Sequence, residues 1–216
     1  MAGLALFDMD DTLVRRNTAG VYFRDRYRQG LTGRREMLQV AWVMVRYKLN
    51  TVDMARLAGT AARSLAGQLE ADLVAVCAEL YRREVRSLIC PEALAALRMH
   101  QARGDVCAIV TASSPYLARP LAAELGIPEV LCTELEVANG RFTGQLRGEA
   151  CFGEAKVRRA EALAAKYGLA LSAATFYTDS HSDLPLLSAV GSPRIVRPDP
   201  RLRLHAWRLA WPVLPW

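Results

Sequence analysis

The chain has little lysine and no cysteine motif. It contains three lysines against 25 arginines, no CxxC pair and no run of five basic residues. Because the five cysteines are odd in number, we expect reduced thiols in the core, and neither a disulfide framework nor a zinc site. Without a basic run, the net charge of +6 indicates a solvated surface with a bias toward anionic substrates, and we expect no nucleic-acid partner.

Long apolar segments are also missing. The run Val40–Val45 is too short to span a bilayer, and no internal repeat or low-complexity segment is visible. Since the N-terminus enters an apolar strand at once, we expect no signal peptide. The reduced thiols indicate a cytoplasmic location, and the short apolar run argues against membrane contact. The 216 residues, 52% of them hydrophobic, suffice for a full core, and this length suits one domain with an insert.

An acidic segment is the most informative feature that is present. The apolar run Leu4–Phe7 predicts a buried strand, and it leads into DMDDTL at residues 8–13. Burying carboxylates at the end of an apolar strand costs folding free energy. Open α/β sheets nevertheless have their active sites at the carboxyl ends of their strands. Asp8 could attack phosphorus, while Asp10 could protonate the leaving oxygen and later activate water. The alternative interpretation is a turn followed by a capped helix.

A second apolar run, Val106–Val110, ends on a hydroxyl residue. Thr111 and Ala112 follow it, and Pro115 suits the first position of a helix. Thr111 and Ala112 would then lie beside a helix N-terminus, whose free N–H groups bind phosphate. We therefore count both among the candidate phosphate-binding residues.

Two further segments carry charged residues that are candidates for the functional site. Lys156 opens a predicted helix, and with so few lysines in the chain its place is informative. The predicted strand Thr175–Thr178 runs into Asp179, Ser182 and Asp183. These carboxylates are the hard oxygen ligands that Mg²⁺ requires.

Taken in order, the pattern DxDxT, strand-end Thr, Lys and DxxxD resembles the haloacid dehalogenase superfamily over almost the whole chain. Residues 179–200 resemble most its subfamily IB, the relatives of phosphoserine phosphatase and of some histidinol-phosphate phosphatases. The resemblance implies an α/β fold, with a Rossmann-like parallel sheet core and an inserted helical cap. It also implies a Mg²⁺-dependent phosphatase that hydrolyses a small phosphomonoester through an aspartyl-phosphate. Phosphoryl transfer to an acceptor other than water and a non-catalytic binding module are the alternatives.

The resemblance assigns roles to individual residues. Asp8 is the nucleophile and Asp10 the acid/base. The Mg²⁺ ligands are Asp8, Asp179 and Asp10, the last through its backbone carbonyl. The phosphoryl group is bound by Thr111, Ala112, Lys156 and Ser182. Asp183 supports the site, either by orienting a ligand or by pairing with Lys156, unless it merely stabilises a helix N-terminus.

The expected organisation is a core of residues 1–14 and 89–216, with a cap of residues 15–88. Helical patterns in the cap cover about 17–30, 35–49, 52–65 and 69–88, and Asn17 can cap the first of them. In the core, Asn139-Gly140 between apolar residues predicts a type I′ hairpin. The oligomeric state is left open.

Two departures from phosphoserine phosphatases bear on the substrate. Ser182 stands where those enzymes usually have Asn. Asn17 stands where they commonly have a Glu that meets the substrate ammonium, and Arg15 and Arg16 precede it. We therefore expect phosphoserine to be a poor substrate. The two arginines either meet an extra anionic group on the substrate or are simply solvated.

The second cap helix is rich in large apolar residues. Trp42, Met44, Val45 and Tyr47 all fall within it. The favoured interpretation is the core of the cap. The alternatives are a pocket for an apolar substrate or a contact with a membrane surface.

Overall fold

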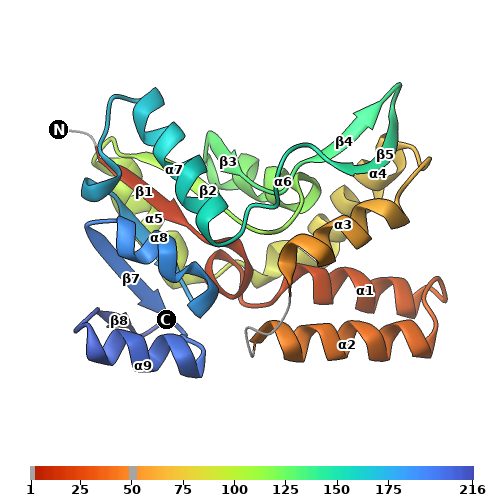
Figure 1. The fold of residues 1–216 in the computed structure, drawn as a ribbon, viewed down its shortest axis with the longest axis horizontal. Helices are drawn as coiled ribbons and strands as arrows, with labels where there is room; N and C mark the ends of the chain where they lie inside the picture. The colour runs from red at the N-terminus through yellow and green to blue at the C-terminus, as the bar shows by residue number, and fades with distance from the viewer. Residues whose placement is uncertain (1–2, 49–52) are drawn as a thin grey trace.

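The computed structural model describes residues 3–48 and 53–216. Its centre is a six-stranded sheet in the order β3-β2-β1-β6-β7-β8 (Figure 1), and every neighbouring pair in it is parallel. This confirms the predicted α/β fold with a parallel sheet. The strands are β1 Leu4–Phe7, β2 Val106–Val110, β3 Glu129–Leu131, β6 Thr175–Thr178, β7 Ser192–Val196 and β8 Val213–Leu214.

Helices cover both faces of the sheet, so the central strands are apolar on both sides. On one face, Ala5 and Phe7 pack with α5 (Pro91–Ala102) and α6 (Pro115–Leu125). On the other, Leu4 and Leu6 pack with α7 (Glu154–Lys166), α8 (Leu184–Ala189) and α9 (Pro200–Arg208). Burying a side chain such as Phe7 contributes roughly 1.5–3 kcal/mol, so β1 is firmly held where the acidic segment begins.

Four α-helices stand between β1 and α5 within the described part of the chain, as the helical patterns predict. They are α1 Thr18–Arg28, α2 Arg34–Lys48, α3 Met54–Ser64 and α4 Glu70–Leu80. The fourth is shorter than predicted, because the chain continues as a π-helical turn, Tyr81–Val85, and a 3₁₀ turn, Arg86–Leu88. The predicted end of the second helix and start of the third lie outside the described residues.

The chain enters and leaves this helical insert at one point. Val14 and Ile89 form an antiparallel bridge. The N–H of Arg15 donates to the Leu88 carbonyl at 2.8 Å, and the N–H of Cys90 donates to the Leu13 carbonyl at 2.9 Å. The two connections are therefore hydrogen-bonded to each other directly after the acidic segment.

The predicted hairpin is confirmed, and it docks on the insert. Its strands are β4 Leu135–Ala138 and β5 Arg141–Leu146. Asn139 and Gly140 both have positive φ, 51° and 73°, as a type I′ turn requires. The N–H of Gly67 donates to the Phe142 carbonyl at 2.8 Å, so β5 extends along the turn between α3 and α4. Figure 1 shows the hairpin reaching from the core to α4.

One prediction about the insert is wrong. Trp42 and Val45 were expected in the core of the cap, but they are 63% and 49% exposed. The reason is that α2 packs mainly against α1 and leaves its opposite face uncovered. The side chains of Met44 and Tyr47 lie outside the described residues.

The state of the cysteines and the lengths of the apolar helices agree with what the sequence predicts. All five cysteines are buried free thiols, as predicted. Among the described residues, no helix combines the length and apolar character needed to cross a bilayer.

Candidate active site

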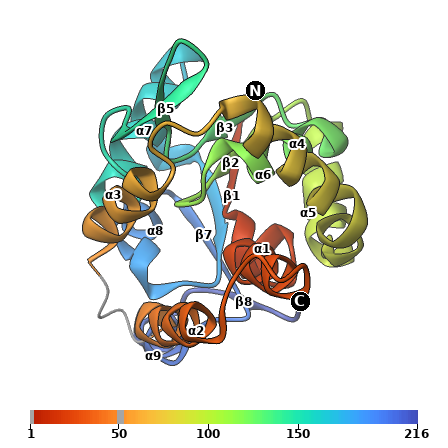
Figure 2. The same ribbon diagram turned by 90° about the vertical axis from the view of Figure 1, so that its right-hand side faces the viewer.

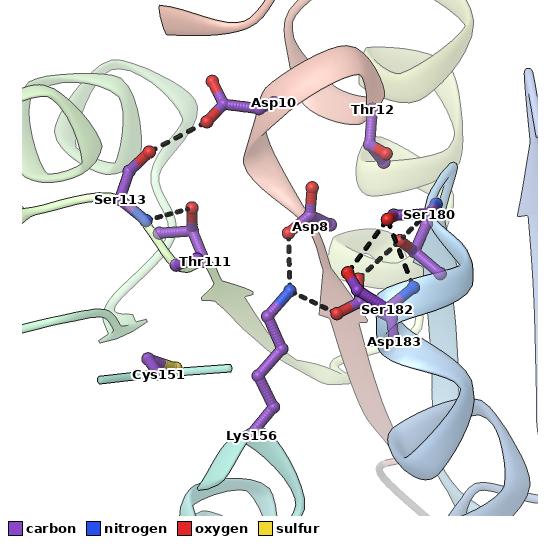
Figure 3. A network of polar contacts seen from close by, with 12 residues as sticks. Asp8, Asp10, Thr12, Thr111, Ser113, Cys151, Lys156, Ser180, Ser182 and Asp183 are labelled. Atoms are coloured by element: carbon purple, nitrogen blue, oxygen red, sulfur yellow. Dashed lines mark hydrogen bonds and ion pairs between the residues drawn. The ribbon is translucent and has the colours of Figure 1, made fainter. Parts of the chain in front are cut away.

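The acidic segment forms a tight turn at the carboxyl end of β1. Residues Met9–Leu13 wind in a π-type turn, with Asp10 in an extended conformation and Asp11 at φ 54°. Aspartate tolerates this left-handed region better than most residues. The backbone conformation alone therefore explains why an aspartate stands at position 11. Because the neighbouring parallel strands end at the same edge, Asp8 and Thr111 come together there (Figure 3). Asp179 follows β6 at that edge, close enough to Asp8 to interact with its charge.

Lys156 bridges two carboxylates in the interior. Its Nζ lies 2.8 Å from Asp8 Oδ1 and 2.8 Å from Asp183 Oδ1. The lysine is 2% exposed, and Asp183 also 2%. The other oxygen of Asp183 accepts a hydrogen bond from Thr178 Oγ1 at 2.6 Å. The structure therefore shows the pairing of Asp183 with Lys156, and it also places Asp183 at the N-terminus of α8.

The local backbone explains how a lysine reaches this position. Gly153 begins α7 at φ 53° and ψ −126°, a conformation that residues with a Cβ avoid. Lys156 therefore lies in the first turn of the helix, where the helix dipole disfavours a cation. The ion pairs with the two buried carboxylates offset that cost. These ion pairs, and not the helix propensity of lysine, therefore explain its position.

Asp10 points away from Lys156, toward the insert. Its Oδ1 accepts the backbone N–H of Thr18 at 2.7 Å, and its Oδ2 accepts the Ser113 hydroxyl at 2.8 Å (Figure 3). Burial raises the pKa of Asp10, and these two hydrogen bonds oppose the rise. The carboxyl group is thus fixed in orientation and biased toward its protonated form. Sequence reasoning missed Ser113, although it stands two residues after Thr111.

Asp179 lies near Asp8 in a strongly acidic neighbourhood. Burial raises the pKa of Asp179 well above its usual range, and the charges of Asp8, Asp11 and Asp183 add to this. Thr12 Oγ1 lies 3.4 Å from Asp179 Oδ1, a weak contact between the two loops. Burial likewise raises the pKa of Asp8, against the opposing effect of Lys156.

These residues suit a divalent cation that takes oxygen ligands. The cluster places three carboxyl groups, those of Asp8, Asp179 and Asp183, around the single ammonium of Lys156, so that acidic groups outnumber basic ones there. In the described part of the chain, no three His, Cys, Asp or Glu side chains converge as a metal cage. Mg²⁺ does not need one, because it usually takes one or two carboxylates, several waters and substrate phosphate oxygens.

Thr111 and Ala112 form the loop between β2 and α6. Thr111 is buried, and its Oγ1 accepts the N–H of Ser113 at 3.1 Å. The carbonyl of Ala112 accepts the hydroxyl of Thr133 at 2.7 Å. This loop is held from both sides directly before the N-terminus of α6, where sequence reasoning expected a phosphate.

Ser182 is turned toward its own loop. Its hydroxyl lies 2.9 Å from that of Ser180. Asp199 fixes this loop, since its N–H donates to the Asp179 carbonyl at 2.9 Å and its Oδ2 accepts the N–H of His181 at 2.6 Å. No motif pointed to Asp199, which acts from a distant part of the chain.

The residues after the acidic segment have structural partners. Asn17 caps α1, as predicted, by accepting the N–H of Gly20 at 3.1 Å. Arg15 forms an exposed ion pair with Glu92 at 3.0 Å. The hypothesis that Arg15 meets a substrate anion is therefore not supported in this conformation.

Comparison with known proteins identifies relatives along the whole chain. A model of the haloacid dehalogenase-like hydrolase family matches residues 5–188. A phosphoserine phosphatase of Mycobacterium tuberculosis is 32% identical over 222 residues, which cover 99% of this chain and 70% of that protein. A histidinol-phosphatase of Neisseria meningitidis is 29% identical over 223 residues, which cover 99% of both.

Solved structures share the fold. A Bordetella pertussis protein of unknown function aligns with a TM-score of 0.88 at 33% identity, covering 99% of this chain and 98% of that one. A substrate-bound phosphoserine phosphatase aligns with a TM-score of 0.74 at 19% identity, covering 94% and 90%.

Proposed function

Because this chain belongs to the haloacid dehalogenase-like hydrolases and is a phosphatase of that family, we propose that it hydrolyses a small phosphomonoester through an aspartyl-phosphate on Asp8. The observation that carries this is the buried Asp8–Lys156 ion pair at the end of β1. Figure 3 shows the second oxygen of Asp8 directed away from Lys156, and we propose that this oxygen attacks phosphorus. A cytosolic location is part of the proposal, supported by the five free thiols.

In the first step, a carboxylate oxygen of Asp8 attacks phosphorus, and the bond from phosphorus to the leaving oxygen breaks. Asp10 gives its proton to that oxygen, and its raised pKa favours the protonated form that this requires. Lys156 and the loop at Thr111 stabilise charge on the phosphoryl oxygens. Such positioning and electrostatic stabilisation provide most of the catalysis in phosphoryl transfer.

In the second step, water attacks phosphorus and Asp10 takes its proton. The bond between Asp8 and phosphorus breaks, which releases inorganic phosphate and restores the carboxylate. Asp183 holds Lys156 in place throughout through its ion pair at 2.8 Å.

We propose that Mg²⁺ is held by the carboxylates of Asp8 and Asp179 and by the backbone carbonyl of Asp10. When bound, it would shield the negative charges of Asp8 and the phosphoryl group from each other. The carboxyl groups of Asp8, Asp11 and Asp183 around Asp179 support this assignment, because they raise the pKa of Asp179 and a bound cation would offset their repulsion.

We expect hydrolysis of an aryl phosphate to stop in excess EDTA and to return when Mg²⁺ is added. Asp179→Asn should mimic metal removal, because it takes away one of the two carboxylates proposed to hold the cation. Asp72→Asn, on the exposed face of α4, is the matched control and should leave the rate unchanged. Full activity in EDTA, with metal content verified as zero, would contradict the metal assignment.

The helical insert is proposed to act as a cap over the site, with the hairpin as part of it. The N–H of Thr18, in the first turn of α1, donates to Asp10, so the insert already touches the candidate acid. The relatives named above act on phosphoserine and histidinol phosphate, so small phosphomonoesters form the substrate class.

Within that class, we expect phosphoserine to be a poor substrate. Asn17 provides no carboxylate for the substrate ammonium, and losing a charge-assisted hydrogen bond costs roughly 1.5–3 kcal/mol, or about one to two orders of magnitude in kcat/KM. Steady-state kinetics on phosphoserine, histidinol phosphate and simple sugar phosphates, measured side by side, test this. Phosphoserine turnover far above that of all the others would refute the inference from Asn17.

A further inference from the structure

Exposed hydrophobic side chains are concentrated at two helices. Of the fourteen large hydrophobic side chains that are exposed in the described residues, eight lie on or directly beside α2 and α9. Trp42 on α2 is 63% exposed and Trp207 on α9 is 79% exposed. Such a concentration of large apolar groups marks an interaction surface. The eight are Leu31, Leu38, Trp42, Val45, Leu204, Trp207, Leu209 and Val213.

Both helices are basic. The sequence of α2 carries Arg34, Arg35, Arg46 and Lys48 against one acid, Glu36. The sequence of α9 carries three arginines and no acidic residue. By contrast, α4 also exposes Val74 and Val76, but its sequence has three acidic residues and no basic one. Of these three helices, α2 and α9 combine apolar exposure with an excess of positive charge, and α4 does not.

The two helices lie on the same side of the molecule. Figure 1 and Figure 2 both place α2 and α9 along the lower edge, with α4 toward the opposite side. α2 packs on α1, and α9 buries Leu202 and Ala206 in the core. Their exposed residues therefore belong to the faces turned away from the protein. We call this combined surface, formed by the exposed faces of α2 and α9, the α2–α9 edge.

The α9 part of this edge is hollowed. A groove of about 450 Å³ lies between α9 and the segment leading into β8. Its lining combines two tryptophans with one arginine, which offers an apolar floor beside a cation. The lining residues are Arg203, Ala206, Trp207, Ala210, Trp211 and Val213.

We propose that the α2–α9 edge binds the surface of an anionic lipid bilayer. Tryptophan and leucine would enter the interfacial region, and the flanking arginines would meet lipid phosphates. A second copy of the chain fits less well, because an isologous contact at this edge would place arginines against arginines. This proposal does not depend on the reaction, and it replaces the expectation of no membrane contact.

The test is flotation of the full-length protein with vesicles of phosphatidylcholine, with and without phosphatidylglycerol. We expect binding only to the phosphatidylglycerol vesicles, and less of it as salt increases. Trp42→Gln with Trp207→Gln should weaken partitioning roughly ten-fold, and Arg34→Gln with Arg201→Gln about five-fold for each arginine removed. The matched control, Val74→Gln with Val76→Gln on acidic α4, should bind like the wild type.

All three variants should hydrolyse an aryl phosphate at the wild-type rate, which shows that they are folded. The proposal is overturned if the wild type stays with the soluble fraction at low salt, or if the α4 control loses binding equally. It is also overturned if light scattering shows a lipid-free dimer that the tryptophan variant dissociates, since the edge would then bind a second copy.

Discussion

Replacing Asp8 by Asn is expected to reduce kcat by about 10⁴-fold or more, while the protein remains folded. The amide keeps the shape of the side chain but cannot attack phosphorus. Lys156 would still pair with Asp183 at 2.8 Å, so the buried ammonium would keep one carboxylate. Hydrolysis of an aryl phosphate, together with thermal unfolding, measures the two effects separately.

Asp11→Asn is the matched control for this change. It lies in the same turn at φ 54°, which asparagine also tolerates, so activity should stay close to that of the wild type. Acid-quenched mass spectrometry during turnover should detect one added phosphoryl group on the wild type and none on Asp8→Asn. A phosphorylated Asp8→Asn protein, or one with near-normal turnover, would assign the nucleophile elsewhere.

Replacing Lys156 by Met is expected to damage both stability and catalysis. Removing one partner of a buried ion pair typically costs about 3–5 kcal/mol of unfolding free energy, and here two carboxylates lose their cation. Loss of a preorganised charge at the phosphoryl group should lower kcat by roughly 10²–10³-fold. Urea denaturation and steady-state kinetics measure these losses.

The double variant Lys156→Met with Asp183→Asn separates the two roles of the lysine. It removes one of the two carboxylates that lose their cation in Lys156→Met. The double variant should therefore regain unfolding free energy without regaining activity. In Lys156→Met itself, the folded-state pKa of Asp8 lies further above its unfolded value. Protonation then favours the folded state, so the stability deficit should shrink as the pH falls. A deficit that grows on acidification, or activity restored in the double variant, would contradict this account.

The sheet and the positions of the acidic residues could be predicted from the sequence because both depend on local signals. The apolar runs before Asp8, Thr111 and Asp179 are strands in the structure, and parallel strands bring their carboxyl ends to one edge. The same holds for the Asn139-Gly140 turn, whose conformation depends on two adjacent residues.

What escaped prediction depends on long-range packing. The pairing of Lys156 with both Asp8 and Asp183 joins three separate segments, and Asp199 fixes the Asp179 loop from a fourth. β3 has only three half-buried residues, too few for a recognisable pattern. The exposure of Trp42 could not be foreseen because a periodic apolar pattern does not show whether a second layer covers the helix.

The antiparallel bridge between Val14 and Ile89, where the insert begins and ends, has a consequence for how this protein can evolve. The entropy needed to close a loop rises only slowly with its length, and here the ends of the insert are already held together by the core. Lengthening or shortening the loops that join the helices of the insert should therefore change the free energy of folding little. Substrate preference can diverge by recombination at this junction, while the carboxylates and the lysine below it are inherited unchanged.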